Sequence, residues 1–270
     1  MSGAISKSRL KSWTIFLAVL TPVLILGAVS YFQVRADLTD AALQRRASIA
    51  FLTATLLRER LDRLVDVGTA LATRVRFREL IEEGDWSGAA KILKDVPANF
   101  PYIERIVLAD TAGTIHGDTT VPSDIVGKNF AFRDWYKGAS VLWQPYVSEV
   151  FKAAAAPFYT GIVVSIPIRS ETGTVLGIAG MQVVTTTLLD WAGDIEVGPG
   201  GFVYFTDQRG QLLAHPKFST QTEIVDFSSV SAVERLLKGE SGTGIFYNQI
   251  ENISNLVAYA PVSGYRWGVV

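Results

Sequence analysis

The chain has 270 residues, enough for one or two domains of ordinary size. Its 25 lysine and arginine residues almost balance its 26 aspartate and glutamate residues, so charge gives no reason to expect a nucleic acid or an acidic partner. The chain has no cysteine, which excludes zinc–thiolate sites, disulfide scaffolds and thiol nucleophiles.

Residues 13–32 form an uncharged stretch near the N-terminus. As a helix rising about 1.5 Å per residue, a segment of this length crosses the roughly 30 Å hydrocarbon core of a bilayer. Trp13 at one end and Tyr31 at the other suit the two membrane interfaces, and Pro22 inside the span is tolerated in membrane helices. We therefore expect a transmembrane helix over residues 13–33.

Basic side chains precede this span: Lys7, Arg9 and Lys11. By the positive-inside bias, residues 1–12 are expected in the cytoplasm and the rest of the chain outside. A cleaved signal peptide is the alternative. The apolar run is longer than a typical signal-peptide core, and no small-residue cleavage site follows it, so the pattern favours a retained anchor.

From residue 34 to about 78 the pattern predicts one long helix without proline. Apolar and small residues recur alternately every three and four positions: Leu43, Ala47, Ala50, Ala54, Leu57, Leu61, Leu64, Gly68, Leu71 and Val75. Such a seam is typical of a heptad pattern, and the rod would be roughly 65 Å long. It suits a homodimer contact, a spine for sensor lobes, or both. A helix that packs only on its own domain is the alternative.

Shorter elements follow, beginning with two small helices predicted within residues 79–94. Residues 103–109 and 114–116 are expected to be strands joined by the turn Asp110–Gly113, and the same design returns within residues 202–215. This weak repeat indicates two related lobes. In each D-x-x-G the aspartate caps the turn and the glycine takes a positive φ. Calcium binding is a minor alternative, because no EF-hand ligand series accompanies either turn.

A distinctive aromatic segment lies in the middle of the chain. Residues 132–139 place Arg133 beside Trp135 and Tyr136, and Tyr146 follows. A guanidinium presents donors in a fork that fits a carboxylate, and the rings supply walls and polar tips. This combination favours a pocket for a small anion. The alternative is an arginine paired with a local acid and aromatic residues that fill a core.

The second half of the chain is rich in predicted strands. We expect residues 157–168 and 174–184 to form a hairpin, followed by a short helix at residues 185–191. Residues 197–201 are predicted to be a glycine-rich hinge. The final predicted strands lie near residues 243–249, 255–261 and 266–270.

Several of these segments together resemble a known family. FRDWYKGA (132–139), WQPYVSEVF (143–151) and the hairpin 161–184 resemble the membrane-distal half of a bacterial double Cache sensor domain. GGFVYFTDQRGQLLAHP (200–216) and LVAYAPVSGYRWGVV (256–270) resemble its membrane-proximal half. The resemblance covers roughly residues 35–270. It implies an α+β fold with two PAS-like antiparallel-sheet lobes on one long helix, and extracytoplasmic ligand sensing by a transmembrane receptor.

The expected organisation follows from the anchor and the resemblance together. The sensor would be held in the bacterial inner membrane and face the periplasm, and its downstream output would be a chemoreceptor, kinase or cyclase module that this sequence does not contain. We therefore expect a truncated product, a fragment, or a stand-alone sensor. The predicted parts are residues 1–12 (cytoplasmic), 13–33 (membrane), 34–78 (stalk), 79–194 (membrane-distal, ligand-binding lobe) and 195–270 (membrane-proximal lobe, where we place no site).

The resemblance also implies residue roles. The amino-acid-binding subset of double Cache domains uses an Arg, Trp, Tyr set for the ligand carboxylate, which Arg133, Trp135 and Tyr136 match. A further tyrosine and two acidic residues hold the ammonium group. Tyr146 matches that tyrosine, whereas the acidic positions are filled by other residues, namely Ser148 and Gln182.

This mixture of retained and lost residues predicts the ligand class. A buried ammonium group without an anionic partner costs several kcal/mol, which neutral Ser148 and Gln182 offset poorly. We therefore expect a small carboxylate or similar anion without an α-amino group. Lys128, where the subset has an aromatic residue, is expected to be solvated. An amino-acid sensor with a non-standard ammonium site is the alternative, for example if Glu149 turns inward.

Other functions have less support in the sequence. No metal cluster, nucleophile elbow, phosphate-binding loop or cofactor motif is present, so an enzyme is not expected. A secreted solute-binding protein is opposed by the long helix and the retained span. The only histidines, His116 and His215, take the same place in each predicted hairpin. They could sense acidity, but structural or surface roles are expected.

Overall fold

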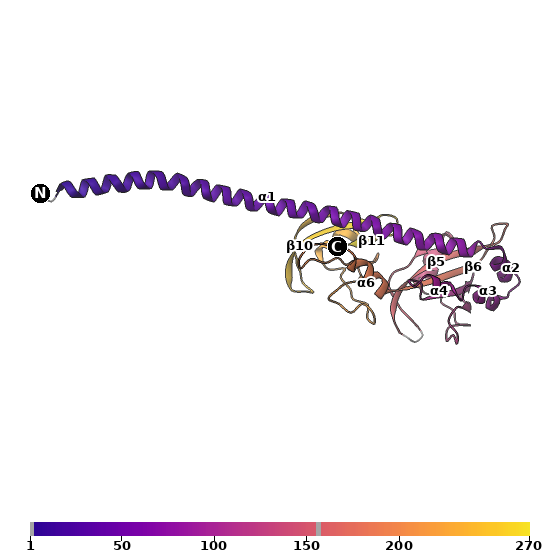
Figure 1. The fold of residues 1–270 in the computed structure, drawn as a ribbon. Coiled ribbons are helices and arrows are strands. Elements are labelled where there is room, and N and C mark those ends of the chain that lie inside the picture. Colours follow the sequence, from indigo (N-terminus) through magenta and orange to yellow (C-terminus); the bar gives the residue numbers. More distant parts are fainter. Residues whose placement is uncertain (1–2, 155–157) are drawn as a thin grey trace. The chain divides into compact units, whose positions relative to one another are not determined.

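The computed structural model describes residues 3–154 and 158–270, and contacts divide the chain into two compact units, Met1–Arg45 and Arg46–Val270. Helix α1 (Gly3–Ala72) begins in the first unit and ends in the second. The second unit contains all the strands of the described chain, and Figure 1 shows them as two separate sheets beside the later part of α1.

The first unit is helical from Gly3 onward and contains Pro22 without interruption. It provides the one helical stretch of the described chain that is long and apolar enough to cross a membrane, with none of that stretch buried by protein. Trp13, Leu26 and Phe32 each expose more than half of their surface. Apolar side chains without protein cover suit a lipid environment better than water.

Within the second unit, α1 packs on the sheets through the seam that the sequence predicts. Ala50, Leu57, Leu61 and Leu64 are buried in the largest hydrophobic cluster together with residues of both sheets. Gly68 allows the closest approach, because a Cβ there would lie 2.6 Å from side-chain atoms of Ile166 and Met181. The buried part of the seam therefore serves as a spine within one chain, and a dimer would have to use another face of the helix.

The helix is shorter than predicted. It ends at Ala72, Arg74 is extended with φ −62° and ψ 129°, and α2 (Val75–Glu82) begins in a new direction. The predicted continuation to residue 78 is thus wrong, because the chain turns so that Phe77 is buried while Val75 is left exposed. Helix α3 (Trp86–Ile92) follows, with the Asp85 carboxylate accepting a bond from the Gly88 amide at 2.9 Å, and then α4 (Val96–Asn99).

The first lobe is built on an antiparallel sheet with the strand order β2-β1-β6-β5-β3, and β4 also pairs with β5. Helix α5 (Asp134–Ser140) packs near this sheet and α6 (Thr185–Gly193) follows it. The strands are β1 (Arg105–Asp110), β2 (Ile115–Asp118), β3 (Tyr146–Val147), β4 (Phe151–Lys152), β5 (Thr160–Arg169) and β6 (Val175–Val184).

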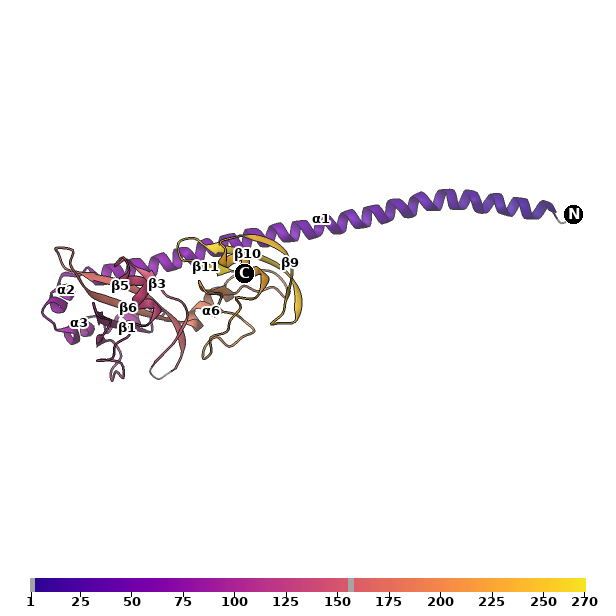
Figure 2. The same ribbon diagram turned by 180° about the vertical axis from the view of Figure 1, so that it is seen from behind.

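The second lobe has a sheet with the order β8-β7-β11-β10-β9, seen from behind in Figure 2. Its strands are β7 (Phe205–Thr206), β8 (Leu212–Ala214), β9 (Gly242–Asn248), β10 (Ile253–Val262) and β11 (Trp267–Val269). Helix α7 (Ser231–Leu237), which the sequence reading did not include, packs on β10 and β11. The α+β class with a long helix and two antiparallel sheets is confirmed.

Both D-x-x-G segments form the predicted turns. Asp110 accepts bonds from the Ala112 and Thr114 amides at 2.9 Å, and Gly113 has φ +83°. In the second lobe, the corresponding glycine, Gly210, has φ +80°. A positive φ is readily available to glycine and rarely to other residues, which explains the spacing of the motif.

A candidate ligand pocket in the first lobe

A small pocket opens between the sheet of the first lobe and the segment that leads into α5. Its volume is about 30 Å³. The polar groups in its wall are two arginines and one glutamine, and the remainder is aliphatic or aromatic. The lining residues are Arg105, Val107, Ile115, Ile125, Phe130, Arg133, Trp135, Phe151, Ala153, Ala154 and Gln182.

Arg133 offers an open cation to this pocket. It is half-buried in an extended conformation just before α5, with φ −76° and ψ 148°. Its guanidinium lies 5.4 Å from the centre of the Phe132 ring and donates a long hydrogen bond of 3.5 Å to the Lys152 carbonyl. Within the described residues it has no acidic partner. The neighbouring Asp134 is already engaged, because it accepts bonds from the Tyr146 hydroxyl and the Glu149 amide.

Arg105 is a second cation in the wall, and its charge is balanced. Its Nε donates to Asp118 at 2.8 Å, and one Nη forms a further bond to the same carboxylate. Both side chains are buried, with 9 % and 1 % of their surfaces exposed. Burial of an ion pair requires this kind of two-pronged geometry, so Arg105 and Asp118 form a fixed part of the wall.

Gln182 and Trp135 complete the polar and aromatic surfaces. Gln182 lies on β6 opposite Arg105 of β1, and its Oε1 accepts a bond from the Tyr159 hydroxyl. Burial raises the pKa of Tyr159 to about 12, so this hydroxyl remains a donor at physiological pH. Trp135 is buried at the start of α5.

Three residues predicted for the site lie outside the walls of this pocket. The Tyr136 hydroxyl donates to the Thr111 carbonyl at 2.5 Å. The Tyr146 hydroxyl donates to Asp134 at 3.1 Å, and burial raises its pKa. Ser148 is buried and accepts a bond from the Val163 amide at 2.9 Å. All are close to the Arg133 segment, and the tyrosines brace the region around it.

The sequence analysis predicted Arg133, Trp135 and Gln182 of this wall and missed its other residues, among them Arg105, Phe151 and Ala153. Phe151 and Ala153 are two positions apart in the sequence. The tyrosine and aspartate of the amino-acid motif have the same spacing, and the sequence analysis aligned them with Tyr146 and Ser148. Arg105 could have been suspected from the sequence, because it is a charged residue at the start of the otherwise apolar strand β1. Side chains of a strand alternate between its two faces, so a charged residue there can face a pocket.

Other candidate groups lie outside the wall of this pocket, although Glu149 lines an adjoining cavity of about 210 Å³ together with Arg133 and Trp135. Glu149 pairs with Arg209 at 3.3 Å, and Lys128 is exposed as expected. His116 contacts Asp110 at 2.8 Å and stacks on Trp86. His215 is fully buried in the second lobe, and burial lowers its pKa to about 4.

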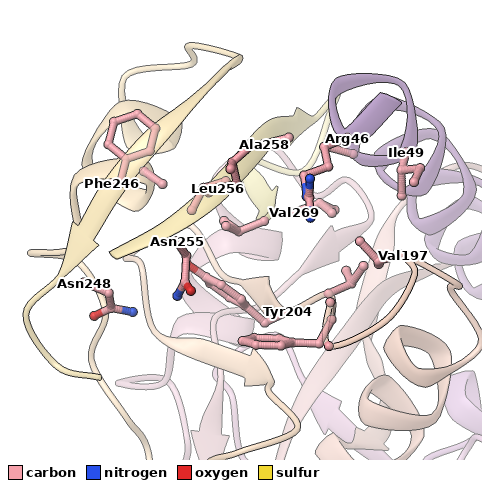
Figure 3. A pocket seen from close by; sticks show the side chains of 18 of the residues that line it. Arg46, Ile49, Val197, Tyr204, Phe246, Asn248, Asn255, Leu256, Ala258 and Val269 are labelled. Atoms are coloured by element: carbon pink, nitrogen blue, oxygen red, sulfur yellow. The ribbon is translucent and has the colours of Figure 1, made fainter. Parts of the chain in front are cut away.

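A larger cavity of about 180 Å³ lies in the second lobe (Figure 3). Arg46 and Ile49 of α1 line it on one side, and Leu256 of β10 and Tyr204 line it elsewhere.

The comparisons with known proteins agree with this architecture. The family model dCache_1, described as a Cache domain, matches residues 33–270. The chain therefore belongs to the Cache family. No match was found among curated proteins.

Solved structures with the same fold include ligand-binding domains of chemoreceptors. One is that of the Pseudomonas aeruginosa PAO1 amino acid chemoreceptor PctB with L-Gln, at 18 % identity and TM-score 0.62, covering 83 % of this chain and 87 % of that one. A second, PctC with GABA from the same organism, has 21 % identity, TM-score 0.60 and coverages of 83 % and 95 %. The Pseudomonas fluorescens chemoreceptor CtaA with L-isoleucine has 18 % identity, TM-score 0.63 and coverages of 89 % and 93 %.

Proposed function

We propose that this Cache domain is the extracytoplasmic sensor of a bacterial transmembrane receptor, and that its first-lobe pocket binds a small carboxylate without an α-amino group. The membrane-distal position of the first lobe, the N-terminal anchor and the cytoplasmic N-terminus are parts of the same proposal. Binding rather than catalysis is the expected role, because Cache domains are ligand-binding modules and the pocket has no nucleophile or general base in its wall.

The observation that carries the proposal is the open guanidinium of Arg133 in a wall without a carboxylate. Two arginines face the pocket, and Asp118 neutralises Arg105, so one positive charge remains. That charge matches a monoanion. A carboxylate can accept charge-assisted bonds from Arg133, each worth about 1.5–3 kcal/mol.

An ammonium group would find little in this pocket. The two positions where the amino-acid motif would place acids are, by the spacing of the wall residues, Ala153 and Gln182. The Ala153 side chain offers no acceptor, and the Gln182 side-chain oxygen already accepts a bond from the Tyr159 hydroxyl. Burying a cation without an anionic partner costs several kcal/mol. The amino acids bound by PctB, PctC and CtaA therefore do not transfer to this chain as the favoured ligand class.

The walls also limit the size and polarity of the ligand. The pocket is small, with a volume of about 30 Å³, so it favours a ligand with few atoms. Its remaining surface is aliphatic and aromatic, from side chains such as Ile125, Phe130 and Phe151. We therefore favour short aliphatic monocarboxylates.

A matched pair of ligands tests this proposal by calorimetry on the full chain in detergent. Propionate and alanine differ in one α-amino group, so we expect binding of propionate and none, or far weaker binding, of alanine. The Arg133→Gln variant should lose at least about tenfold in affinity because it loses the charged contact. Lys128→Gln, which removes an exposed cation of the same region, should bind as the parent does. Binding of alanine without propionate would refute the ligand class.

Contacts near the pocket support a proposal for how the signal is transmitted. A ligand shifts a conformational equilibrium only if it binds one state better than the other. We propose that the bound anion draws the Arg133 segment against the sheet, which favours a closed state of the first lobe. The adjoining β3–β4 segment contacts the second lobe directly, since the Val150 amide donates to Asp207 at 3.0 Å.

A further inference from the structure

Another cavity of the first lobe lies at the end of α1, beside the end of β5. Its volume is about 220 Å³, and its described lining residues are all different from those of the candidate pocket around Arg133. The last turn of α1 lines it through Thr69 and Ala72, and β5 lines it through Ile166 and Arg169. We call this space the helix-end cavity. It is separate from the first pocket and touches the long helix directly.

Arg78 of α2 lines the helix-end cavity with its donors unpaired. Only 19 % of its side chain is exposed. Within residues 3–154 and 158–270, the one polar contact of this side chain joins Nη2 to the Glu171 carboxylate at 3.7 Å, which is too long for a hydrogen bond. Its Nε is buried and has no partner in the same residues. A guanidinium has five N–H donors, and leaving them without acceptors costs free energy, so an added acceptor would be stabilising.

A second arginine of the wall, Arg169, fixes the position of Trp143. One Nη of Arg169 donates to the Trp143 carbonyl at 2.7 Å, and the other donates to the Gly173 carbonyl at 3.0 Å. Trp143 has φ +51°, which is uncommon for a bulky residue and persists only where the surrounding structure holds it. The half-buried Trp143 thereby becomes a fixed aromatic part of the wall.

The size and the remaining wall of the helix-end cavity suit a flat ring. Besides Trp143, the apolar lining comes from Ala72, Pro145, Ile166 and Pro167. An apolar cavity of about 150 Å³ holds a benzene molecule. The volume of about 220 Å³ therefore has room for one aromatic ring and a small polar group. Aromatic rings also stack favourably on an indole.

The charges around the helix-end cavity favour a single negative charge on the ligand. No aspartate or glutamate is among its described lining residues, and the nearby Glu171, which is 79 % exposed, balances one of the two arginines. The carbonyls at the end of α1 would repel an anion, but the Thr69 carbonyl already accepts bonds from the Thr73 amide at 3.0 Å and from the Thr73 hydroxyl at 2.9 Å.

We propose that the helix-end cavity is a second ligand site of the first lobe and binds an aromatic monocarboxylate, with its carboxylate on Arg78 and its ring against Trp143. A carboxylate accepts the parallel donors of a guanidinium fork, which supplies the acceptors that Arg78 lacks. The bound molecule would contact the last turn of α1 and the end of β5 together, and so hold this end of the helix against the sheet.

Three probe molecules test the ligand class by calorimetry on the full chain in detergent. The measurements use the Arg133→Gln variant, so that the first pocket contributes little to the signal. Benzoate should bind, whereas benzyl alcohol, a ring without a charge, and acetate, a charge without a ring, should bind at least about tenfold more weakly. Absence of benzoate binding would overturn the proposal. Equal binding of benzyl alcohol or of acetate would overturn the aromatic monocarboxylate as the ligand.

Arginine variants test the location of the site. Arg78→Gln should lower the affinity for benzoate at least about tenfold. Its melting temperature should stay within about 2 °C of the parent, because Arg78 donates no side-chain hydrogen bond in the described chain. Arg76→Gln removes a more exposed cation from the same helix and should bind benzoate as the parent does.

The two sites of the first lobe should respond to different variants. Benzoate should lose affinity in Arg78→Gln and keep it in Arg133→Gln, while propionate should show the reverse. If benzoate loses its affinity in Arg133→Gln and keeps it in Arg78→Gln, it occupies the first pocket and the helix-end site is overturned. The response of propionate tests the first pocket alone, so the failure of either proposal can be told from the failure of the other.

Discussion

Arg105 and Arg133 face the same pocket but differ in what surrounds their charges. Arg105 is buried and held by Asp118 through two bonds, so its charge is used within the wall. Arg133 is half-buried and has only a long bond to a carbonyl in the described chain. The same side chain therefore has a structural role at one position and is available for a ligand at the other.

The missing acids can be restored to test the ligand class. In the double variant Ala153→Asp, Gln182→Asp, carboxylates would stand in the wall where the spacing of the amino-acid motif places them. We expect this variant to gain affinity for alanine and to lose at least about tenfold for propionate, because the added charges attract ammonium and repel a lone carboxylate. Calorimetry with both ligands measures the change.

Ser148→Asp provides the matched control for this exchange. Ser148 lies outside the pocket wall and its hydroxyl is bonded within the sheet. The Ser148→Asp variant should therefore leave the preference between propionate and alanine unchanged. A switch toward alanine in this variant alone would show that the original alignment, through Tyr146 and Ser148, is the correct one.

Because His215 is buried, we expect the protein to lose stability in acid. It is enclosed by the rings of Phe202, Tyr204, Phe218 and Phe227, and burial lowers its pKa from 6.5 to about 4. Between these values the unfolded chain binds a proton that the folded chain excludes. The free energy of unfolding therefore falls as pH falls from 6.5 to about 4, by roughly 3 kcal/mol at most.

Denaturant unfolding across this pH range checks the prediction. His215→Gln cannot take up the proton and should flatten the dependence, even if it lowers stability overall. His116→Gln changes the other histidine, which is exposed and bonded to Asp110. The His116→Gln variant should keep the part of the pH-dependent loss of stability that His215 causes. If the free energy of unfolding of His215→Gln falls with pH as steeply as that of the parent, His215 is not the cause.

At the scale of elements, the predicted residues Tyr146 and Ser148 lie outside the wall of the pocket that Arg133 lines. Val147 pairs with Val164 and Phe151 with Gly161, so four steps along one strand match three along β5. The extra residue resets the alternation, and Phe151 returns to the face of Tyr146 beside the pocket. The sequence between these residues gives no sign of such a bulge, so it could not predict that Phe151 and Ala153 lie in the pocket wall.

Element types were more predictable than their ends. The β5–β6 hairpin, both D-x-x-G turns and the three last strands follow from alternation and turn chemistry. The break at Thr73–Arg74 did not, because the heptad pattern continues through it and only tertiary packing of Phe77 redirects the chain. Helix α7 was missed because its seven residues are too short to establish a clear period.

A chain of hydrogen bonds joins the pocket segment to the last strand. The Tyr146 hydroxyl donates to Asp134 and accepts from Gln208, and the Trp267 indole donates to Gln208, each at 3.1 Å. Asp134 directly follows Arg133, and Trp267 begins β11. These contacts give a short physical route from the segment beside the candidate pocket to the second lobe.

A double-mutant cycle tests this route. Tyr146→Phe and Gln208→Ala should each cost about 1 kcal/mol in the free energy of unfolding, and the double variant should cost less than their sum because both remove the same bond. Glu149→Gln with Arg209→Ala is the control, since Arg209 is largely exposed and its ion pair with Glu149 should contribute about 0–1 kcal/mol. Strict additivity for Tyr146 and Gln208 would contradict a shared contact.

At the scale of the whole molecule, the absence of cysteine makes the proposed topology easy to measure. Ser170→Cys lies in the exposed turn of the β5–β6 hairpin, whereas Ser8→Cys precedes the apolar stretch. A membrane-impermeant maleimide added to cells with a permeabilised outer membrane should label Cys at 170 and not at 8. Mature protein beginning after residue 32 would instead indicate a cleaved signal peptide and a released protein.

The two lobes share the largest part of their interior, although each also has a smaller cluster of its own. Leu61 of α1, Ile166 of the first sheet and Trp267 of the second belong to one continuous set of buried side chains. Lobes that share an interior in this way cannot melt independently, since exposing one half strips contacts from the other. On heating, both sheets should therefore unfold in a single transition. A ligand that stabilises one lobe would raise the melting temperature of the other lobe to the same degree.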